Sequence, residues 1–62
     1  MLNAGDDKAL RVILHSNGAE ALLRMQEWAK SAEQAQSALR LDPGHEKSAR
    51  RLKLAREHLL GE

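Results

Sequence analysis

The sequence predicts an all-α protein, built as an antiparallel helix–turn–helix followed by a third helix. Apolar residues recur at helical intervals of three and four in three segments. The cluster Asp42-Pro43-Gly44 separates the last two segments, and proline disfavours a helical conformation at the residue before it. Connections as short as those between the segments force consecutive helices to lie antiparallel.

The first helix is expected from about residue 6 to residue 25, after a flexible N-terminus of residues 1–5. Asp6 and Asp7 suit its beginning, because carboxylates favour the exposed N–H groups at the positive end of the helix dipole. Gly18 follows a turn-like Ser-Asn pair, but the apolar stripe keeps its phase beyond the glycine, which favours one helix, with a bend at Gly18 as the alternative. The stripe predicts a buried face comprising Leu10, Ile13, Leu14, Ala21, Leu22 and Met25.

The second helix is expected at about residues 28–41, ending before Pro43, and the third at about residues 46–60, with Gly61 as a C-terminal cap. Small residues on the second helix would let a neighbour approach closely. Its predicted buried stripe comprises Ala32, Ala35, Ala38 and Leu39. The stripe of the third helix comprises Ala49, Leu52, Ala55, Leu59 and Leu60.

The composition indicates a small and marginal core. The chain has 62 residues, no cysteine and one aromatic residue, Trp28, which excludes disulfides and leaves a core of Leu, Ala, Ile, Val and Met. A chain this short buries only about 60% of the surface that it exposes when unfolded. We therefore expect either a fragment of a longer array or a piece that self-associates, with a homodimer as one form.

The charges are nearly balanced, with 10 basic and 9 acidic residues for a net charge of +1. Residues 44–62 carry five basic and three acidic groups, a small local excess that makes nucleic-acid or anionic-membrane binding the weakest functional interpretation. No apolar run approaches the roughly 20 residues of a membrane span, and residues 1–5 lack the features of a signal peptide. We expect a soluble cytoplasmic protein that binds neither nucleic acid nor membrane.

A family resemblance rests on two stretches of sequence. Residues 17–28 read Asn-Gly-Ala-Glu-Ala-Leu-Leu-Arg-Met-Gln-Glu-Trp, and the next helix carries Ser31, Ala35 and the ending Ala38-Leu-Arg-Leu-Asp-Pro43. This pattern resembles the tetratricopeptide repeat, a helix–turn–helix unit of about 34 residues that stacks into a superhelix. The resemblance places one repeat at residues 12–45 and the first helix of another from Glu46, about one and a half repeats. The long first helix is similar to that of immunophilin-type co-chaperones.

Three residues depart from the family pattern. His15 stands where a bulky apolar residue is common, Gly18 where leucine or arginine is common, and Ser31 where alanine is nearly standard. None of them adds a large buried charge, so the expected fold is unchanged. We expect Gly18 and Ser31 to loosen the packing between the first two helices.

The resemblance also implies a binding site. Co-chaperone repeats of this family hold the C-terminal Glu-Glu-Val-Asp tail of heat-shock chaperones in a carboxylate clamp, and Asn17, Lys47 and Arg51 stand at matching places. Lys47 and Arg51 are four residues apart and so project from one helix face. Arginine can bind a carboxylate through two parallel hydrogen bonds, while lysine adds a point charge. Two further clamp groups would come from a preceding repeat, so we expect weak peptide binding.

The same resemblance makes the first helix of each pair line the ligand groove. The expected groove residues are Ile13, Glu20, Arg24 and Leu54. The alternative is that the basic third helix is an ordinary solvated face with surface ion pairs such as Glu46 with Arg50, or that the groove takes another ligand. A self-associating structural piece without a peptide ligand is the second functional interpretation.

No motif of enzyme chemistry is present. The three histidines lack close ligand spacing and no cysteine can join them, so no metal site is expected. The sequence contains no glycine-rich phosphate loop, nucleophile motif or convincing pair of acid and base carboxylates. Trp28 alone is typical of a packing residue rather than a base-stacking platform. We expect no enzymatic activity and no cofactor.

Overall fold

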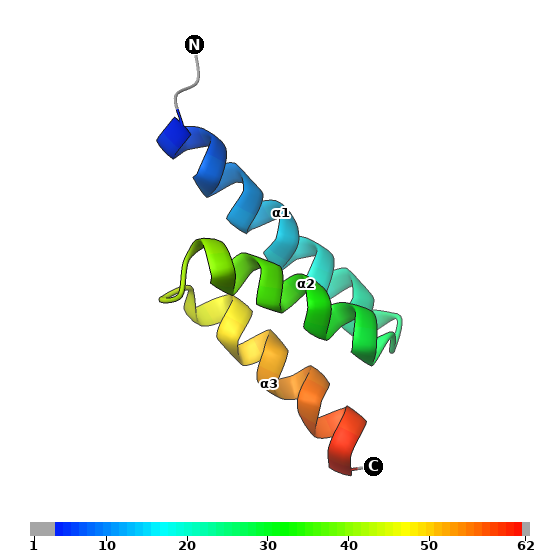
Figure 1. Cartoon of the computed structure of the whole chain (residues 1–62). Helices are drawn as coiled ribbons and strands as arrows, with labels where there is room; N and C mark the ends of the chain where they lie inside the picture. Colours follow the sequence, from blue (N-terminus) through cyan, green and yellow to red (C-terminus); the bar gives the residue numbers. More distant parts are fainter. Residues whose placement is uncertain (1–3, 62) are drawn as a thin grey trace.

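Three α-helices make up the described chain, which covers residues 4–61 of a computed structural model. They are α1 (Ala4–Arg24), α2 (Trp28–Leu41) and α3 (Glu46–Gly61), joined by short turns and arranged as an antiparallel hairpin with a third helix (Figure 1). This arrangement confirms the predicted all-α class. Helix α1 runs through Gly18 without interruption and begins earlier than expected, because Ala4 and Gly5 are helical. The rest of the expected flexible N-terminus, residues 1–3, lies outside the described residues.

The turn between α1 and α2 is a Schellman-type helix ending. The amide of Glu27 donates to the carbonyl of Leu22 at 2.8 Å, and the amide of Gln26 donates to the carbonyl of Leu23 at 3.0 Å. These are the two bonds that close a helix when the residue after its end is left-handed. That residue is Gln26, with φ of 62°, where glycine is usual. The sequence contains no glycine at this position that would mark the helix end.

The turn between α2 and α3 follows from its proline. Asp42 has an extended conformation, with φ of −142° and ψ of 90°, as expected before Pro43. Its side-chain Oδ1 accepts a hydrogen bond from the amide of Gly44 at 3.2 Å, which tightens the turn. His45 then precedes α3, and its Nδ1 accepts from the amide of Ser48 at 3.3 Å. An imidazole therefore fills the place of the usual N-cap oxygen.

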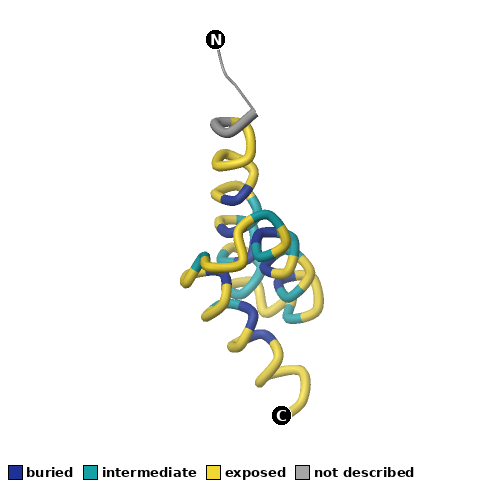
Figure 2. Tube along the Cα trace, turned by 60° about the vertical axis from the view of Figure 1, so that its left-hand side comes forward, coloured by how far each residue is buried: buried dark blue, intermediate teal, exposed yellow. Residues whose placement is uncertain are grey.

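Small side chains dominate the core. Helix α2 packs against both α1 and α3, while α1 and α3 contact each other less extensively. Figure 2 shows the buried positions concentrated where the three helices meet, with the end of α3 exposed. The buried apolar residues are Val12, Ala19, Ala35, Ala38, Leu52 and Ala55. Alanine at these crossings lets the helix backbones approach closely, at the cost of a core with little apolar volume.

The predicted buried face of α1 is wrong. Leu10, Ile13, Leu14 and Met25 are exposed by 46%, 50%, 65% and 66%, Ala21 is also exposed, and only Leu22 is half-buried. The residues that face the core are Val12, Ser16 and Ala19, which lie on the other side of the helix. A prediction from the large apolar residues of α1 gives the wrong buried face, because the other helices pack closely against the smaller residues Val12, Ser16 and Ala19.

The stripes of α2 and α3 agree better with prediction. Ala35 and Ala38 are buried, and Ala32 and Leu39 are partly buried against the cluster of Ala19, Ala35 and Leu52. In α3, Leu52 and Ala55 are buried, but Ala49, Leu59 and Leu60 are exposed. Leu59 and Leu60 lie in the last turn of α3, at the exposed end of the bundle. No helix among residues 4–61 combines the length and the apolar character that crossing a bilayer requires.

Candidate functional site

Arg51 joins α3 to α1. Its Nη1 donates to the carbonyl oxygen of Ser16 at 2.8 Å and also to the Ser16 hydroxyl. Its Nη2 donates to Oε1 of Glu20 at 2.9 Å. The side chain is only 17% exposed, because it lies along the α1–α3 contact. A guanidinium with this set of partners is held in one orientation.

The three clamp candidates line a single pocket. Asn17 on α1 and Lys47 and Arg51 on α3 border a pocket of about 190 Å³ between the two helices. The other lining residues are Ile13, Ser16, Glu20 and His45. Asn17 and Lys47 are both exposed, so solvent reaches both side chains at the pocket. The structure therefore places the three clamp candidates beside one another at a single pocket.

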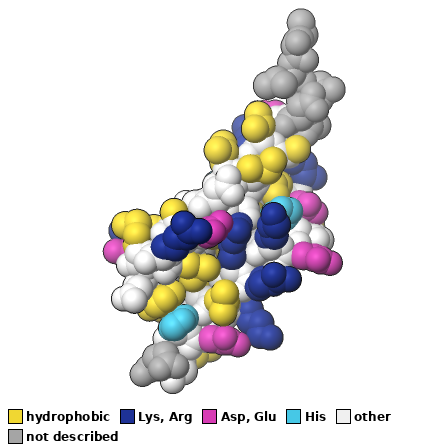
Figure 3. Space-filling view, turned by 180° about the vertical axis from the view of Figure 1, so that it is seen from behind, with side chains coloured by type: hydrophobic (Ala, Val, Ile, Leu, Met, Phe, Trp, Pro, Cys, Tyr) yellow, Lys and Arg dark blue, Asp and Glu magenta, His cyan; other side chains and the backbone are white. Residues whose placement is uncertain are grey.

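The expected groove residues border this pocket or its neighbours. Ile13 lies in it, and Leu54 lines an adjoining pocket of about 300 Å³ together with Glu20, Lys47 and Arg51. Arg24 lies further along α1, where its Nη2 donates to Oε2 of Glu20 at 2.8 Å. Figure 3 shows Lys and Arg side chains gathered across the middle of one face, with hydrophobic side chains on either side of them.

The electrostatics of the groove depend on Glu20. Its carboxylate bridges Arg24 and Arg51, so one negative charge lies between two positive ones. Lys47 makes no ion pair with any described residue and adds an unbalanced positive charge at the pocket. The positive charge of Lys47 can therefore attract a ligand carboxylate, whereas Arg51 is already paired with the Glu20 carboxylate.

Sequence reasoning misses two parts of this site. It places Glu20 in the groove but gives no sign of the pairing with Arg51, which lies 31 residues away. It excludes His45 from a metal site and gives it no other role, yet His45 lines the pocket and caps α3. Only the Glu20–Arg24 spacing of four residues is a local signal for an ion pair. The pairing across two helices has no signature in a single sequence.

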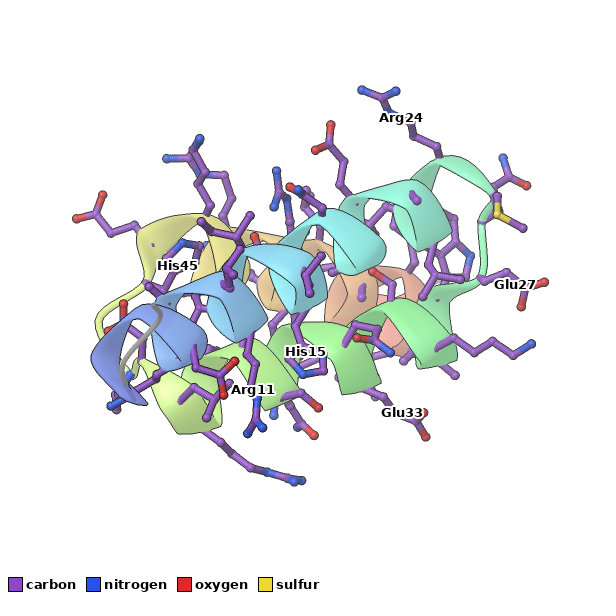
Figure 4. All side chains as sticks on the ribbon, turned by 90° about the horizontal axis from the view of Figure 1, so that it is seen from above. Arg11, His15, Arg24, Glu27, Glu33 and His45 are labelled. Carbon is purple, nitrogen blue, oxygen red and sulfur yellow. The ribbon has the colours of Figure 1, made fainter. Side chains whose placement is uncertain are left out.

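The three histidines have separate structural contacts. Nδ1 of His15 lies 2.7 Å from Oε1 of Gln34, and Figure 4 shows its ring pointing from α1 toward α2. Nδ1 of His45 lies 2.8 Å from the Ser48 hydroxyl. His58 stacks on Trp28 with ring centroids 3.8 Å apart. Within the described residues, no three His, Cys, Asp or Glu side chains are grouped so that they could hold a metal ion.

Comparison with known proteins adds no relative: no protein-family model matches the chain, and neither a curated protein nor a solved structure is significantly similar to it.

Proposed function

We propose that this chain is a protein-interaction module whose α1–α3 groove binds an acidic C-terminal peptide. The observation that carries the proposal is the shared pocket of Asn17, Lys47 and Arg51. A terminal carboxylate offers several acceptor lone pairs, which suit an amide, an ammonium and a guanidinium donor at one place. The ligand class is a peptide whose last residue adds a second carboxylate.

The tetratricopeptide resemblance supports the same proposal. About one and a half repeats would produce three features of this chain. These are an α1–α2 hairpin with small residues at the crossing, an end of α2 at Asp42-Pro43, and an α3 that lies beside α1. On this basis we propose a co-chaperone-like role in the cytoplasm, with the acidic tail of a heat-shock chaperone as the ligand. The basis is the sequence pattern and the helix arrangement together.

Titration with a peptide ending in Glu-Glu-Val-Asp tests the proposal. We expect a dissociation constant on the order of 100 μM, because three donors bind a flexible and strongly hydrated ligand. The backbone amide signals of Asn17, Lys47 and Arg51 should shift most. The same peptide with an amidated C-terminus is the control, since it loses the terminal charge and keeps the side chains. Equal affinity for the two peptides would refute the clamp.

A second candidate function, self-association, is favoured by the distribution of large apolar side chains. Among the described residues, Val12 and Leu52 are buried, whereas seven large apolar side chains are exposed: Leu10, Ile13, Leu14, Met25, Leu54, Leu59 and Leu60. A domain whose apolar surface lies mostly outside its core gains stability by covering it with another copy.

Sedimentation equilibrium tests this second candidate. We expect a dimer at micromolar concentration in the parent chain and a shift toward monomer in Leu14→Glu, which places a charge on the 65% exposed site of α1. Glu33→Leu is the control. It replaces a charged residue on the exposed side of α2 with an apolar one, the reverse of Leu14→Glu, and should not weaken association. A folded monomer throughout would exclude self-association.

A further inference from the structure

Glu20 lies at the centre of the groove. Its side chain lines the pocket of Asn17, Lys47 and Arg51, and also the two neighbouring pockets, one at Leu54 and one at Arg24. No ligand can run along this groove without meeting the Glu20 carboxylate. A negative charge at that position opposes the acidic ligand for which the surrounding donors are suited.

Both oxygens of this carboxylate are bound by arginines. Oε1 accepts from Nη2 of Arg51 at 2.9 Å, and Oε2 accepts from Nη2 of Arg24 at 2.8 Å. The two arginines differ in their surroundings. Arg51 is 17% exposed and is also bonded to Ser16, whereas Arg24 is 79% exposed. Arg51 is therefore the fixed partner, and Arg24 can follow the carboxylate if it moves.

We propose that Glu20 is an internal competitor, which occupies Arg51 in the empty groove and must be displaced toward Arg24 when an acidic peptide binds. This inference rests on the proposed function. A ligand carboxylate that approaches Nη2 of Arg51 meets the Glu20 carboxylate, which already accepts a hydrogen bond from this nitrogen, and two carboxylates at one guanidinium edge repel each other. Because Arg24 keeps Oε2, the displaced side chain retains a charged partner, and the exchange leaves no carboxylate unpaired.

Displacement makes Glu20 a determinant of specificity. A ligand with a single carboxylate can bind Asn17 and Lys47 while Glu20 stays on Arg51. A ligand whose last residue is Asp or Glu brings two carboxylates, so one can bind Lys47 while the other replaces Glu20. The groove should therefore prefer a C-terminal acidic residue over a C-terminal neutral one.

Glu20→Gln tests the competition, because glutamine keeps the size and the acceptor oxygen and removes the charge. We expect the peptide ending in Glu-Glu-Val-Asp to bind this variant about tenfold more tightly than the parent chain. Glu33→Gln is the matched control: it makes the same charge change on α2, and Figure 4 shows Glu33 pointing away from the side of the molecule on which Arg24 lies. Its affinity should rise less than twofold.

A measurement on the parent chain covers the case in which Glu20→Gln disturbs the fold. The carboxyl carbon-13 signal of Glu20 should shift when the free-acid peptide is added, and should stay in place with the amidated peptide. One outcome refutes the competition and leaves the proposed function standing. In it, the parent chain binds the free-acid peptide, Glu20→Gln and Glu33→Gln bind this peptide with equal affinity, and the Glu20 carbon-13 signal does not move. If no variant distinguishes free acid from amide, the proposed function itself fails.

Discussion

The Ser31 hydroxyl donates a hydrogen bond to the backbone carbonyl of Ala19 at 2.8 Å, and neither residue is exposed to solvent. This bond ties α2 to α1 where the two helices cross. The family pattern predicts that a serine here loosens the crossing. Instead, the side chain is small enough for close packing and supplies a polar contact as well.

Ser31→Ala should lower the free energy of unfolding by about 0.5–1.5 kcal/mol, the usual net contribution of one hydrogen bond. The loss is moderate because alanine fits the same space and leaves no unpaired side-chain group. Urea denaturation followed by circular dichroism measures it. Ser37→Ala, a half-buried position on the same helix, should change stability by less than about 0.5 kcal/mol. Equal effects of the two variants would mean that the Ser31 bond contributes nothing.

Gln26→Gly should stabilise the protein by about 0.5–1 kcal/mol. Gln26 has a left-handed backbone with φ of 62°, which glycine adopts without steric cost. The same exchange at exposed Gln36, within α2, should destabilise by about 1 kcal/mol, since glycine weakens a helix interior. Thermal melting of the two variants should therefore shift in opposite directions. A lower melting temperature for Gln26→Gly would contradict the left-handed conformation.

Gly18→Ala should also stabilise the chain, by about 0.4–1 kcal/mol, because α1 is helical at this residue and alanine has the higher helix propensity. A Cβ atom at Gly18 would lie 3.7 Å from Oε1 of Gln34, an ordinary contact distance. Gly61→Ala, in the last turn of α3, provides a comparison with a smaller expected gain. Destabilisation by Gly18→Ala would show that the α1–α2 approach is closer than this distance implies.

His58→Ala should expose Trp28 to water. The two rings stack with an interplanar angle of 4°, and Trp28 is the only tryptophan, with no tyrosine present. We expect its fluorescence emission to move to longer wavelength, together with a loss of about 0.5–1.5 kcal/mol in unfolding free energy. The neighbouring exposed substitution Glu57→Ala should leave the emission unchanged. An unaltered spectrum in His58→Ala would mean that α3 does not cover the indole in solution.

Lys47 and Arg51 should differ in what their loss affects. Lys47→Met removes an exposed charge without an ion-pair partner among the described residues, so it should weaken peptide binding and leave the melting temperature nearly unchanged. Arg51→Met breaks the bonds to Ser16 and Glu20 and should also destabilise the fold by about 1–3 kcal/mol. Calorimetry for both binding and unfolding separates the two effects. Identical profiles for the two variants would contradict the structural role of Arg51 in joining α3 to α1.

The sequence by itself determined the helices and their order. Pro43 with Asp42 and Gly44 set the end of α2, and the alanines at positions 35 and 38 set its packing face, because backbone sterics and side-chain size act locally. Under the proposed tetratricopeptide assignment, Asn17 and Arg51, which are 34 residues apart, take equivalent positions of successive helical units.

Only the tertiary structure decided which side of α1 is buried and what Arg51 binds. Both large and small residues recur along α1 at helical intervals, and the choice between the two faces depends on how closely α2 approaches. The Glu20–Arg51 pair depends on α3 lying beside α1, which brings together side chains 31 residues apart. Local patterns define helices and their possible faces, whereas contacts between distant residues follow from how the helices pack.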